Sequence, residues 1–400
     1  MIRFTTAGES HGRALVAIVE GVPAGLRLLA SDVDADLARR MQGYGRGARM
    51  RIEADRAQIL SGVRAGETLG SPIALLIENR DFANWQDVMA VEPVAEPPRR
   101  RLTRPRPGHA DLTGVLKYDR RDARDVLERA SARETAARVA AGAVCRRLLA
   151  EFGVEIGSHV VALGGVEARL PEALPVPLNA AADGSPVRCL DPVAEAAMVA
   201  RIDAARDAGD TLGGVAEVVV RGLPVGLGSH VSWDRKLDAR LAAAWMSIPA
   251  VKGVEIGLGF GASRVPGSEA HDEIVPAARG QADRSGGFHR PTNRAGGLEG
   301  GMTTGAPLTA RLAMKPIATL MRPLASVDLD TGEPAKAQSE RSDVVAVPAM
   351  AVIAEAMAAL VLADAYAEKF GGDSLLEMRR NFDGYLAQLD ARRAGWRGGV

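Results

Sequence analysis

Runs of apolar residues bounded by turn-forming residues recur along the chain and predict short β-strands. Ala14–Glu20 (ALVAIVE) is the clearest of them, because the turn Gly21–Gly25 follows it directly. The other runs of this kind lie at residues 1–6, 58–60, 73–77 and 215–221.

Helices are predicted where a capping residue precedes a long segment without turn residues. The expected starts are Ser31–Asp34, Ser131, where Glu134 completes a capping box, and Asp191-Pro192. The second of these helices should end near Phe152, before Gly153, and the third at Gly209.

The most apolar segment, Pro348–Lys369, predicts a helix that is apolar on all sides and is ended by Gly371-Gly372. Such a helix must lie between layers of the fold. Pro348 and Glu355 interrupt the apolar run, which favours a core helix over a membrane span.

Three segments lack a regular pattern. Residues 81–101 are expected to form a surface excursion, and residues 161–191 a lobe of loops and short strands. The tail at residues 391–400 is expected to be disordered, so we place a single domain at residues 1–390.

Two pieces of the chain are repeated. Gly222–Leu227 (GLPVGL) resembles Gly21–Leu26 (GVPAGL), and Gly297–Leu308 aligns without gaps on Gly62–Ile73. Matching Gly and Pro positions predict matching turns. We interpret the repeats as a duplication about a pseudo-twofold axis, with halves at about residues 1–150 and 210–370; chance in a chain with 44 glycines is the alternative. The predicted fold class is α+β, with two antiparallel sheets around central helices.

Composition narrows the classes of function. The 400 residues are 47% hydrophobic, and 50 Lys+Arg balance 50 Asp+Glu. Zero net charge and 4% aromatic residues argue against a nucleic-acid-binding protein, the alternative from a different class, and against attachment to membranes. Cys145 and Cys189 lack any pairing or metal spacing, and the early charges Arg3 and Glu9 do not fit a signal peptide. A cytoplasmic location is therefore expected.

The segment Arg101–Thr135 holds the highest density of arginine in the chain. Pro105, Pro107 and Gly108 interrupt it, so it cannot be a plain basic helix, and it leads into the predicted helix start at Ser131. Arginines, a rigid turn and a helix N-terminus together predict an anion site.

Two histidines, His11 and His109, lie in polar loops among small residues, a setting that suits proton donors beside an anion. Exposed surface histidines are the alternative. No pair among the six histidines has metal-ligand spacing, so no metal site is expected. Asp343, in Arg341-Ser342-Asp343, is either a helix cap or a carboxylate held near arginine in the same pocket.

Three motifs together resemble the chorismate synthase family: AGESHG (Ala7–Gly12), RPGHAD (Arg106–Asp111) and RASARET (Arg129–Thr135). The resemblance extends to about residue 385 and includes GYGRG, SIPAVKGVEIG, TNRAGGLEGGM, KPIAT and RSD. It implies a β-α-β sandwich, a homotetramer and a dependence on reduced FMN. The implied reaction is the anti 1,4-elimination of phosphate from 5-enolpyruvylshikimate 3-phosphate to give chorismate, the last step of the shikimate pathway.

The resemblance also implies roles for single residues. His11 protonates the departing phosphate with Ser10 beside it, His109 protonates or electrostatically supports the reduced flavin, and Asp343 helps to remove the substrate proton. Positions that match FMN-binding residues are Arg129, Ala130, Ser131, Pro249, Ala250, Gly300, Lys315, Pro316, Ile317, Ala318, Thr319 and Arg341. Arg40 and Arg46 match NADP positions or meet substrate, and the other candidate substrate ligands are Arg49, Arg104, Arg106 and Arg133.

The chain departs from the family pattern at Leu258, where an Asp is frequent, and at Pro249, where some members carry a polar residue. Residues 281–291 form a longer Gly/Arg-rich stretch than in many members. A different enzyme that handles flavin or sugar phosphates is the rival within the enzyme class. The source of the electrons is open between NADPH and a flavin reduced elsewhere; we favour the latter, because no reductase domain is recognisable.

Overall fold

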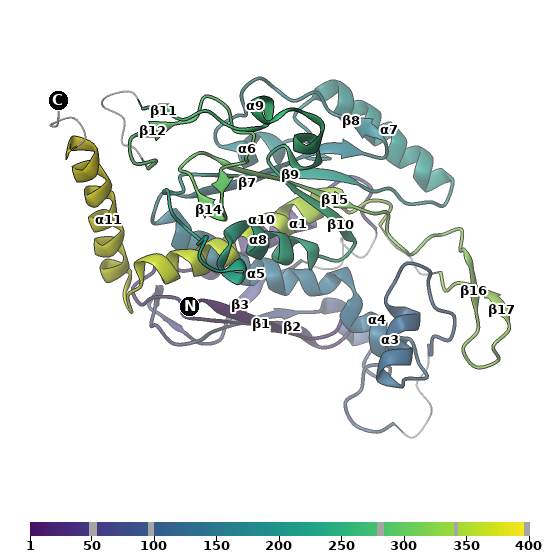
Figure 1. Cartoon of the computed structure of the whole chain (residues 1–400). Coiled ribbons are helices and arrows are strands. Elements are labelled where there is room, and N and C mark those ends of the chain that lie inside the picture. The colour runs from purple at the N-terminus through teal and green to yellow at the C-terminus, as the bar shows by residue number, and fades with distance from the viewer. Residues whose placement is uncertain (48–53, 95–99, 278–283, 340–342, 396–400) are drawn as a thin grey trace.

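The computed structural model describes residues 1–47, 54–94, 100–277, 284–339 and 343–395. Two antiparallel sheets form its framework (Figure 1). The first has the order β1-β2-β6-β3 and consists of β1 (Arg3–Ala7), β2 (Ala14–Glu20), β6 (Ile73–Glu78) and β3 (Ala57–Ile59). The second has the order β10-β15-β9-β7-β8 and consists of β10 (Val251–Ile256), β15 (Leu308–Met314), β9 (Gly214–Arg221), β7 (Glu155–Leu163) and β8 (Val166–Glu167).

Helices occupy the space between the two sheets in Figure 1. They are α1 (Ala30–Met41), α5 (Thr135–Ala150), α8 (Leu237–Met246) and α10 (Val347–Phe370). Helix α5 packs on β2 of the first sheet and along α10, which in turn packs on β7 and β9 of the second. The alternation of β2, in which Leu15, Ala17 and Val19 are buried, turns one face of the first sheet to this core. The predicted α+β class with antiparallel sheets is confirmed.

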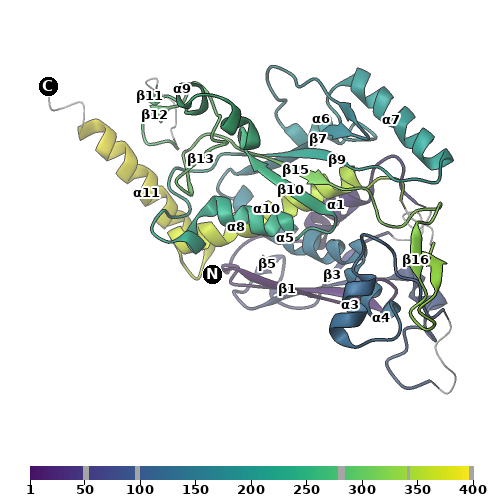
Figure 2. The same ribbon diagram turned by 45° about the vertical axis from the view of Figure 1, so that its right-hand side comes forward.

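The remaining elements cover the edges. The helices are α3 (Asp111–Tyr118), α4 (Arg124–Ala130), α6 (Leu178–Ala182), α7 (Pro192–Asp207), α9 (Gly267–Ala270) and α11 (Leu375–Gly395), with 3-10 turns η1 (Arg80–Asn84), η2 (Ala132–Glu134), η3 (Trp233–Arg235) and η4 (Gly259–Arg264). Four hairpins are β4–β5 (Val63–Arg64, Glu67–Thr68), β11–β12 (Val275–Pro276, Phe288–His289), β13–β14 (Leu298–Glu299, Met302–Thr303) and β16–β17 (Ala325–Val327, Pro334–Lys336). In Figures 1 and 2 the β16–β17 hairpin lies beside α3 and α4, where Thr103 donates to Asp328.

Helix α10 is the centre of the core, as its apolar sequence predicted. Among the residues that the structure describes, it is the one helix long and apolar enough to cross a membrane, but 89% of its most apolar window is buried inside the protein. Glu355, at its middle, is fully buried and is bound by Arg39, Arg146 and Arg188. The ion pairs explain how an acid is tolerated in this helix.

Some local predictions were wrong. Ser131 does not form a capping box: its hydroxyl accepts from Arg133 N, while the Glu134 carboxylate accepts from Thr6 and Arg138, and α5 begins only at Thr135. The lobe expected from residue 161 overlaps β7, a buried strand that begins at Glu155. The expected disordered tail is helical as far as it is described, because α11 continues to Gly395.

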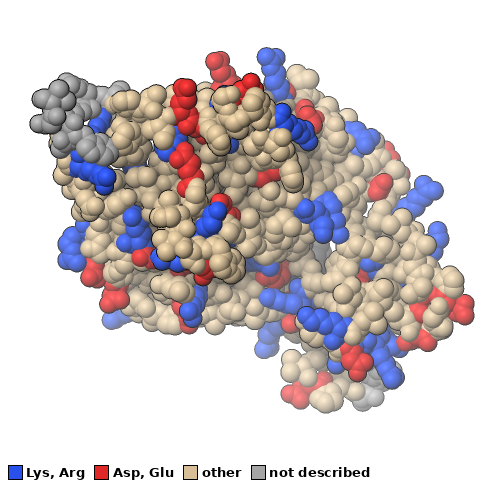
Figure 3. All heavy atoms as spheres, in the orientation of Figure 1, with Lys and Arg blue, Asp and Glu red and all other residues tan. Residues whose placement is uncertain are grey.

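Acidic and basic side chains are interspersed over the face in Figure 3. Lys and Arg gather on its right-hand side, where the segment with α3 and α4 meets the body. This distribution is consistent with a local anion site rather than a whole-face basic surface.

Candidate functional site

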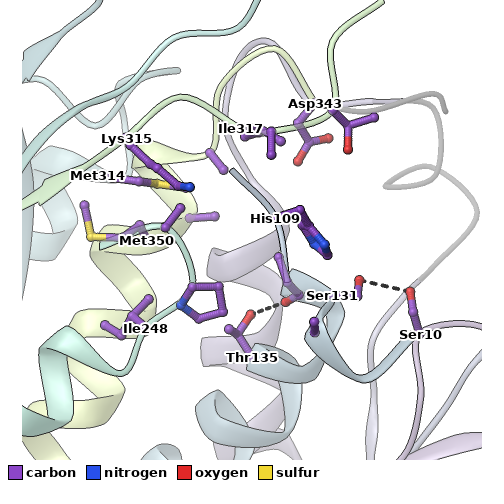
Figure 4. A pocket seen from close by; sticks show the side chains of 18 of the residues that line it. Ser10, His109, Ser131, Thr135, Ile248, Met314, Lys315, Ile317, Asp343 and Met350 are labelled. Carbon is purple, nitrogen blue, oxygen red and sulfur yellow. Dashed lines mark hydrogen bonds between the residues drawn. The ribbon is translucent and has the colours of Figure 1, made fainter. Parts of the chain in front are cut away.

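A cavity of about 440 Å³ lies where α4, α5 and α10 meet the loops after β1 and β15 and the loop between α8 and β10. Most of its wall is apolar and comes from residues such as Ile248, Met314, Met350 and Ile353, while a few polar groups converge on it (Figure 4). This balance is typical of a pocket for a small molecule or cofactor. The sequence-predicted residues that line it are Ser10, His11, Arg40, Arg46, Arg106, His109, Ala130, Ser131, Pro249, Ala250, Lys315, Ile317, Ala318, Thr319 and Asp343.

His11 is held by the loop after β1. Its Nδ1 lies 2.9 Å from both carboxylate oxygens of Glu128 on α4, and its backbone N–H donates to the same carboxylate. The Trp85 ring stacks on the imidazole, with centroids 3.8 Å apart. The imidazole is thus fixed in orientation, with 12% of its side chain exposed.

His109 is held in the same manner from the turn before α3. Its Nδ1 lies 2.5 Å from Oδ1 of Asp111, and Arg106 binds this carboxylate through Nε and Nη2. Gly108, at φ +79°, makes the turn and brings its carbonyl within 2.5 Å of the Lys315 ammonium. In Figure 4 the His109 ring points into the cavity.

Arg40 is a buried cation in the cavity wall, 4% exposed. Its Nε and Nη2 donate to Thr135 Oγ1, and Nη2 also donates to the Ala132 carbonyl. Its Nη1 makes no hydrogen bond within the described part of the chain, and its carboxylate neighbour Asp55 lies at 3.5 Å. Burial, opposed by Asp55, lowers the pKa of Arg40 to about 10, so it remains charged at neutral pH. A charged guanidinium in the cavity wall favours an anionic ligand.

Asp343 joins the GYGRG loop to the start of α10. Its Oδ1 accepts from Gly47 N at 2.6 Å, and its Oδ2 lies 3.2 Å from Nε of Arg46. The N-cap position of α10 is Ala346, which has no side-chain cap, so Asp343 is the carboxylate beside arginine rather than the helix cap. A second cavity of about 220 Å³ adjoins the first and shares Arg46, Thr319 and Asp343 with it.

The residues present fit a flavin. The apolar wall can accept a flat ring system, and Arg40 and Lys315 supply positive charge for a phosphate or a reduced ring. Ala250, in this wall, has φ +68°, a backbone conformation that is costly for alanine and is found at functional sites. Its carbonyl accepts from Lys315 N.

Several predicted residues do not line the cavity. Arg133 is buried against Asp55 and Asn79, Arg129 donates to Thr6 and to the Gly8 carbonyl, and Arg104 is exposed and donates to Gln338. Gly300, in the turn of β13–β14, and Pro316 are also absent from its wall. Arg49 and Arg341 lie outside the described residues, as do residues 281–283 of the longer stretch.

Sequence reasoning missed the partners of the two histidines. Asp111 stands two residues after His109, so the sequence itself contains the signal of an acid beside this histidine. Glu128 is 117 residues from His11, and no local pattern connects them. Trp85 was assigned to a surface excursion, although its ring covers His11.

Comparisons with known proteins show which family the chain belongs to. The model of the chorismate synthase family matches residues 2–367. Among curated relatives, the chorismate synthases of Symbiobacterium thermophilum and Geobacter metallireducens are 60% and 58% identical, over 98% and 97% of this chain and 100% and 99% of theirs. A crystal structure of chorismate synthase is 43% identical and superposes with a TM-score of 0.78 over 98% of each chain.

Identity at this level over nearly the whole length leads to one assignment. The chain belongs to the chorismate synthase family of lyases, enzymes of the shikimate pathway.

Proposed function

We propose that this enzyme converts 5-enolpyruvylshikimate 3-phosphate to chorismate by an anti 1,4-elimination that depends on reduced FMN. In this reaction the C–O bond to phosphate and one C–H bond break, a second ring double bond forms, and inorganic phosphate leaves. The observation that carries the proposal is the convergence of His11, His109, Arg40 and Asp343 on one cavity with an apolar wall.

The flavin would be held by the apolar wall and by the residues that flank it. The candidates in the cavity wall are Ala130, Ser131, Pro249, Ala250, Lys315, Ile317, Ala318 and Thr319. When bound, reduced FMN would lend electron density transiently to the substrate, so that phosphate leaves before the proton. Lys315 and His109 would stabilise negative charge on the reduced ring.

One residue is proposed for each of the two proton transfers, to the departing phosphate and from the substrate. His11 would donate to the departing phosphate, with Ser10 beside it; the Ser131 hydroxyl donates to Ser10 Oγ at 3.1 Å (Figure 4). Asp343 would assist removal of the substrate proton, with the Arg46 guanidinium beside its carboxylate.

The anionic groups of the substrate require cations. Arg40 and Arg46 line the cavity and are the first candidates, whereas Arg106 is already bound by Asp111 and Thr319. Arg46 also lines the smaller adjoining cavity, so the binding of NADPH by Arg40 and Arg46 stays an alternative. We favour a flavin reduced outside this enzyme.

The sandwich and pseudo-twofold repeat also belong to this proposal. In the first copy Thr68 Oγ1 accepts from Leu26 N and donates to the Pro23 carbonyl, and in the second Thr303 Oγ1 accepts from Leu227 N and donates to the Pro224 carbonyl. The same bonds at aligned positions support duplication over chance. A single domain, a homotetramer and a cytoplasmic location complete the proposal.

The decisive experiment is anaerobic turnover of 5-enolpyruvylshikimate 3-phosphate with chemically reduced FMN. We expect chorismate and inorganic phosphate in equal amounts, and none with oxidised FMN. A folded protein that forms no chorismate would contradict the proposal and favour another enzyme of flavin or sugar phosphate chemistry. Flavin reduction by NADPH with the purified enzyme alone would identify the electron source.

A further inference from the structure

Both cavity histidines are bound in the same way by a buried carboxylate. Glu128 lies 2.9 Å from Nδ1 of His11, and Asp111 lies 2.5 Å from Nδ1 of His109. Each carboxylate side chain is 2% exposed. The two acids come from neighbouring helices, α4 and α3, which pack on each other.

An arginine in turn binds each of these acids. Arg124 Nη1 lies 2.8 Å from Oε1 of Glu128, and Arg106 Nε lies 2.8 Å from Oδ2 of Asp111. Burial alone would raise the carboxylate pKa values. The hydrogen bonds from His11 and Arg124 outweigh burial at Glu128, and those from His109 and Arg106 outweigh it at Asp111, so both pKa values lie below their ordinary range. Both acids are therefore ionised at neutral pH and can act only as acceptors.

At His109 the Arg106 Nη2 also lies 3.1 Å from Nδ1, but the Asp111 carboxylate at 2.5 Å is nearer. The nearest group at Nδ1 is thus an acceptor in both pairs, and it decides which ring nitrogen carries hydrogen in the neutral imidazole. Because an ionised carboxylate can only accept a hydrogen bond, the Nδ1–H form is favoured and Nε2 is the atom that exchanges a proton with another group. After an imidazolium gives its Nε2 proton to an anion, it is left as neutral Nδ1–H imidazole, the form that the carboxylate already stabilises.

We propose that Glu128 and Asp111 are positioning residues that hold His11 and His109 as Nδ1–H donors, with Nε2 assigned to the ligands of the cavity. The inference rests on the proposed function, because it assigns a proton transfer to each histidine. Its physical basis, two histidine–carboxylate pairs each bound by an arginine, is independent of the substrate.

A purely structural role is the alternative, because each carboxylate also accepts a backbone N–H, from His11 and from Arg106. Glu128→Gln and Asp111→Asn separate the two roles. The amide oxygen still accepts from the backbone, whereas the amide group no longer requires hydrogen at Nδ1. Asp125→Asn, on the exposed side of α4 next to Arg120, is the matched control.

A pair of double-mutant cycles tests the assignment. We expect Glu128→Gln to lower kcat about 10–100-fold with little change in KM. In a His11→Ala background it should cause no further loss, whereas in a His109→Ala background the full loss should return. Asp111→Asn should show the reverse dependence. Equal losses in both backgrounds would overturn the proposal.

A second measurement needs no turnover. In ¹⁵N-histidine-labelled protein above the titration range of imidazole, the ring signals of His11 and His109, assigned from their Ala variants, should report the Nδ1–H form. Glu128→Gln should populate the Nε2–H form at His11 alone, and Asp111→Asn at His109 alone. Unchanged tautomers in folded variants would overturn the inference even if chorismate is formed, and a wild type that forms none would overturn only the proposed function.

Discussion

Asp343 accepts a hydrogen bond from Gly47, 296 residues earlier in the chain, and lies beside the Arg46 guanidinium. It therefore has both a structural contact and a position in the cavity. Asparagine preserves the acceptor for Gly47 N–H but removes the negative charge, which allows the two contributions to be separated.

We expect Asp343→Asn to lower kcat at least about 10-fold, because a general base or its charge is lost, while thermal stability changes little. Asp203→Asn is the control, since Asp203 accepts from Tyr44 of the same loop without reaching the cavity. Normal turnover combined with a lower Tm would assign Asp343 to the fold alone.

His11→Ala and His109→Ala should each lower the rate about 10²-fold or more, as expected for a lost proton donor. Neither histidine is needed for the apolar wall, so FMN should still bind, as measured by its fluorescence on titration. Rates near that of the wild type would show that both histidines are bystanders.

At the scale of single residues, the sequence predicted residues that stand in short motifs, but it did not predict contacts between residues far apart in the chain. His11 and His109 stood out by residue type and setting, whereas Arg40 was named only through the family resemblance. The partner of His11 did not, because Glu128 reaches it only through the packing of α4 on the loop after β1. Arg133 shows the converse, since its buried bonds to Asp55 and Asn79 cannot be distinguished from ligand binding by sequence.

Helix α10 depends on one acid in its middle. Glu355 is fully buried and accepts from Arg39, Arg146 and Arg188, and also from Asn179. Burial raises its pKa, but the charges of Arg39 and Arg146 outweigh this and lower it to about 2. The carboxylate thus connects α10 with α1 and α5.

We expect Glu355→Gln to lower the free energy of unfolding by about 3–5 kcal/mol at pH 7, because three buried arginines lose their shared anion. The folded pKa lies below the unfolded value, so this contribution is complete above about pH 5 and is lost as the pH falls toward 2.

Urea unfolding of both proteins at pH 7, 5, 4 and 3 checks this prediction: the difference should shrink toward acid. Asp207→Asn, exposed at the end of α7, should change stability by less than about 0.5 kcal/mol. A constant difference at all four pH values would show that lost packing, rather than lost charge, destabilises the variant.

Elements with a strong local signal were predicted nearly to the residue. Strand β2 and the N-cap of α7, where the Asp191 carboxylate accepts from Val193 N and Ala194 N, are examples. Strand β7 was missed because both its faces are buried and it carries Ser158 and His159, so it shows no alternation. His159 is accommodated there by Glu217 on the adjacent strand, a contact that only sheet pairing creates.

The whole molecule contains two copies of one buried threonine network. Thr68 and Thr303 are 3% and 2% exposed, and each joins a strand-end turn to a hairpin through the same two backbone groups. If the chain is a duplication, the same substitution at Thr68 and at Thr303 should therefore change the free energy of unfolding alike.

We expect Thr68→Val and Thr303→Val each to lower the free energy of unfolding by about 1–3 kcal/mol, because a buried N–H and a buried carbonyl lose their partner. The two losses should match and add in the double variant, since the sites share no contact. Chemical denaturation measures them, with exposed Thr331→Val as control. A neutral variant at one site alone would contradict the equivalence of the halves.

At this scale the sequence predicted the fold class, α+β with antiparallel sheets, while the repeat stays a prediction drawn from matching Gly and Pro positions. It could not predict that one cavity would collect residues from the loops after β1 and β15, from the loop before β10 and from the helices α1, α4, α5 and α10. That convergence depends on the packing of α5 and α10, which no local pattern encodes.

Helix α10 also has a consequence for biosynthesis. The arginines that bind Glu355 all precede it in the chain, and α10, the main neighbour of α5, begins at Val347, long after α5 ends at Ala150. During translation both sheets can form while the apolar side of α5 is still uncovered. Until α10 has left the ribosome, the nascent chain therefore lacks the carboxylate that Arg39, Arg146 and Arg188 share. Nascent chains truncated before Val347 should consequently require chaperones to remain unaggregated.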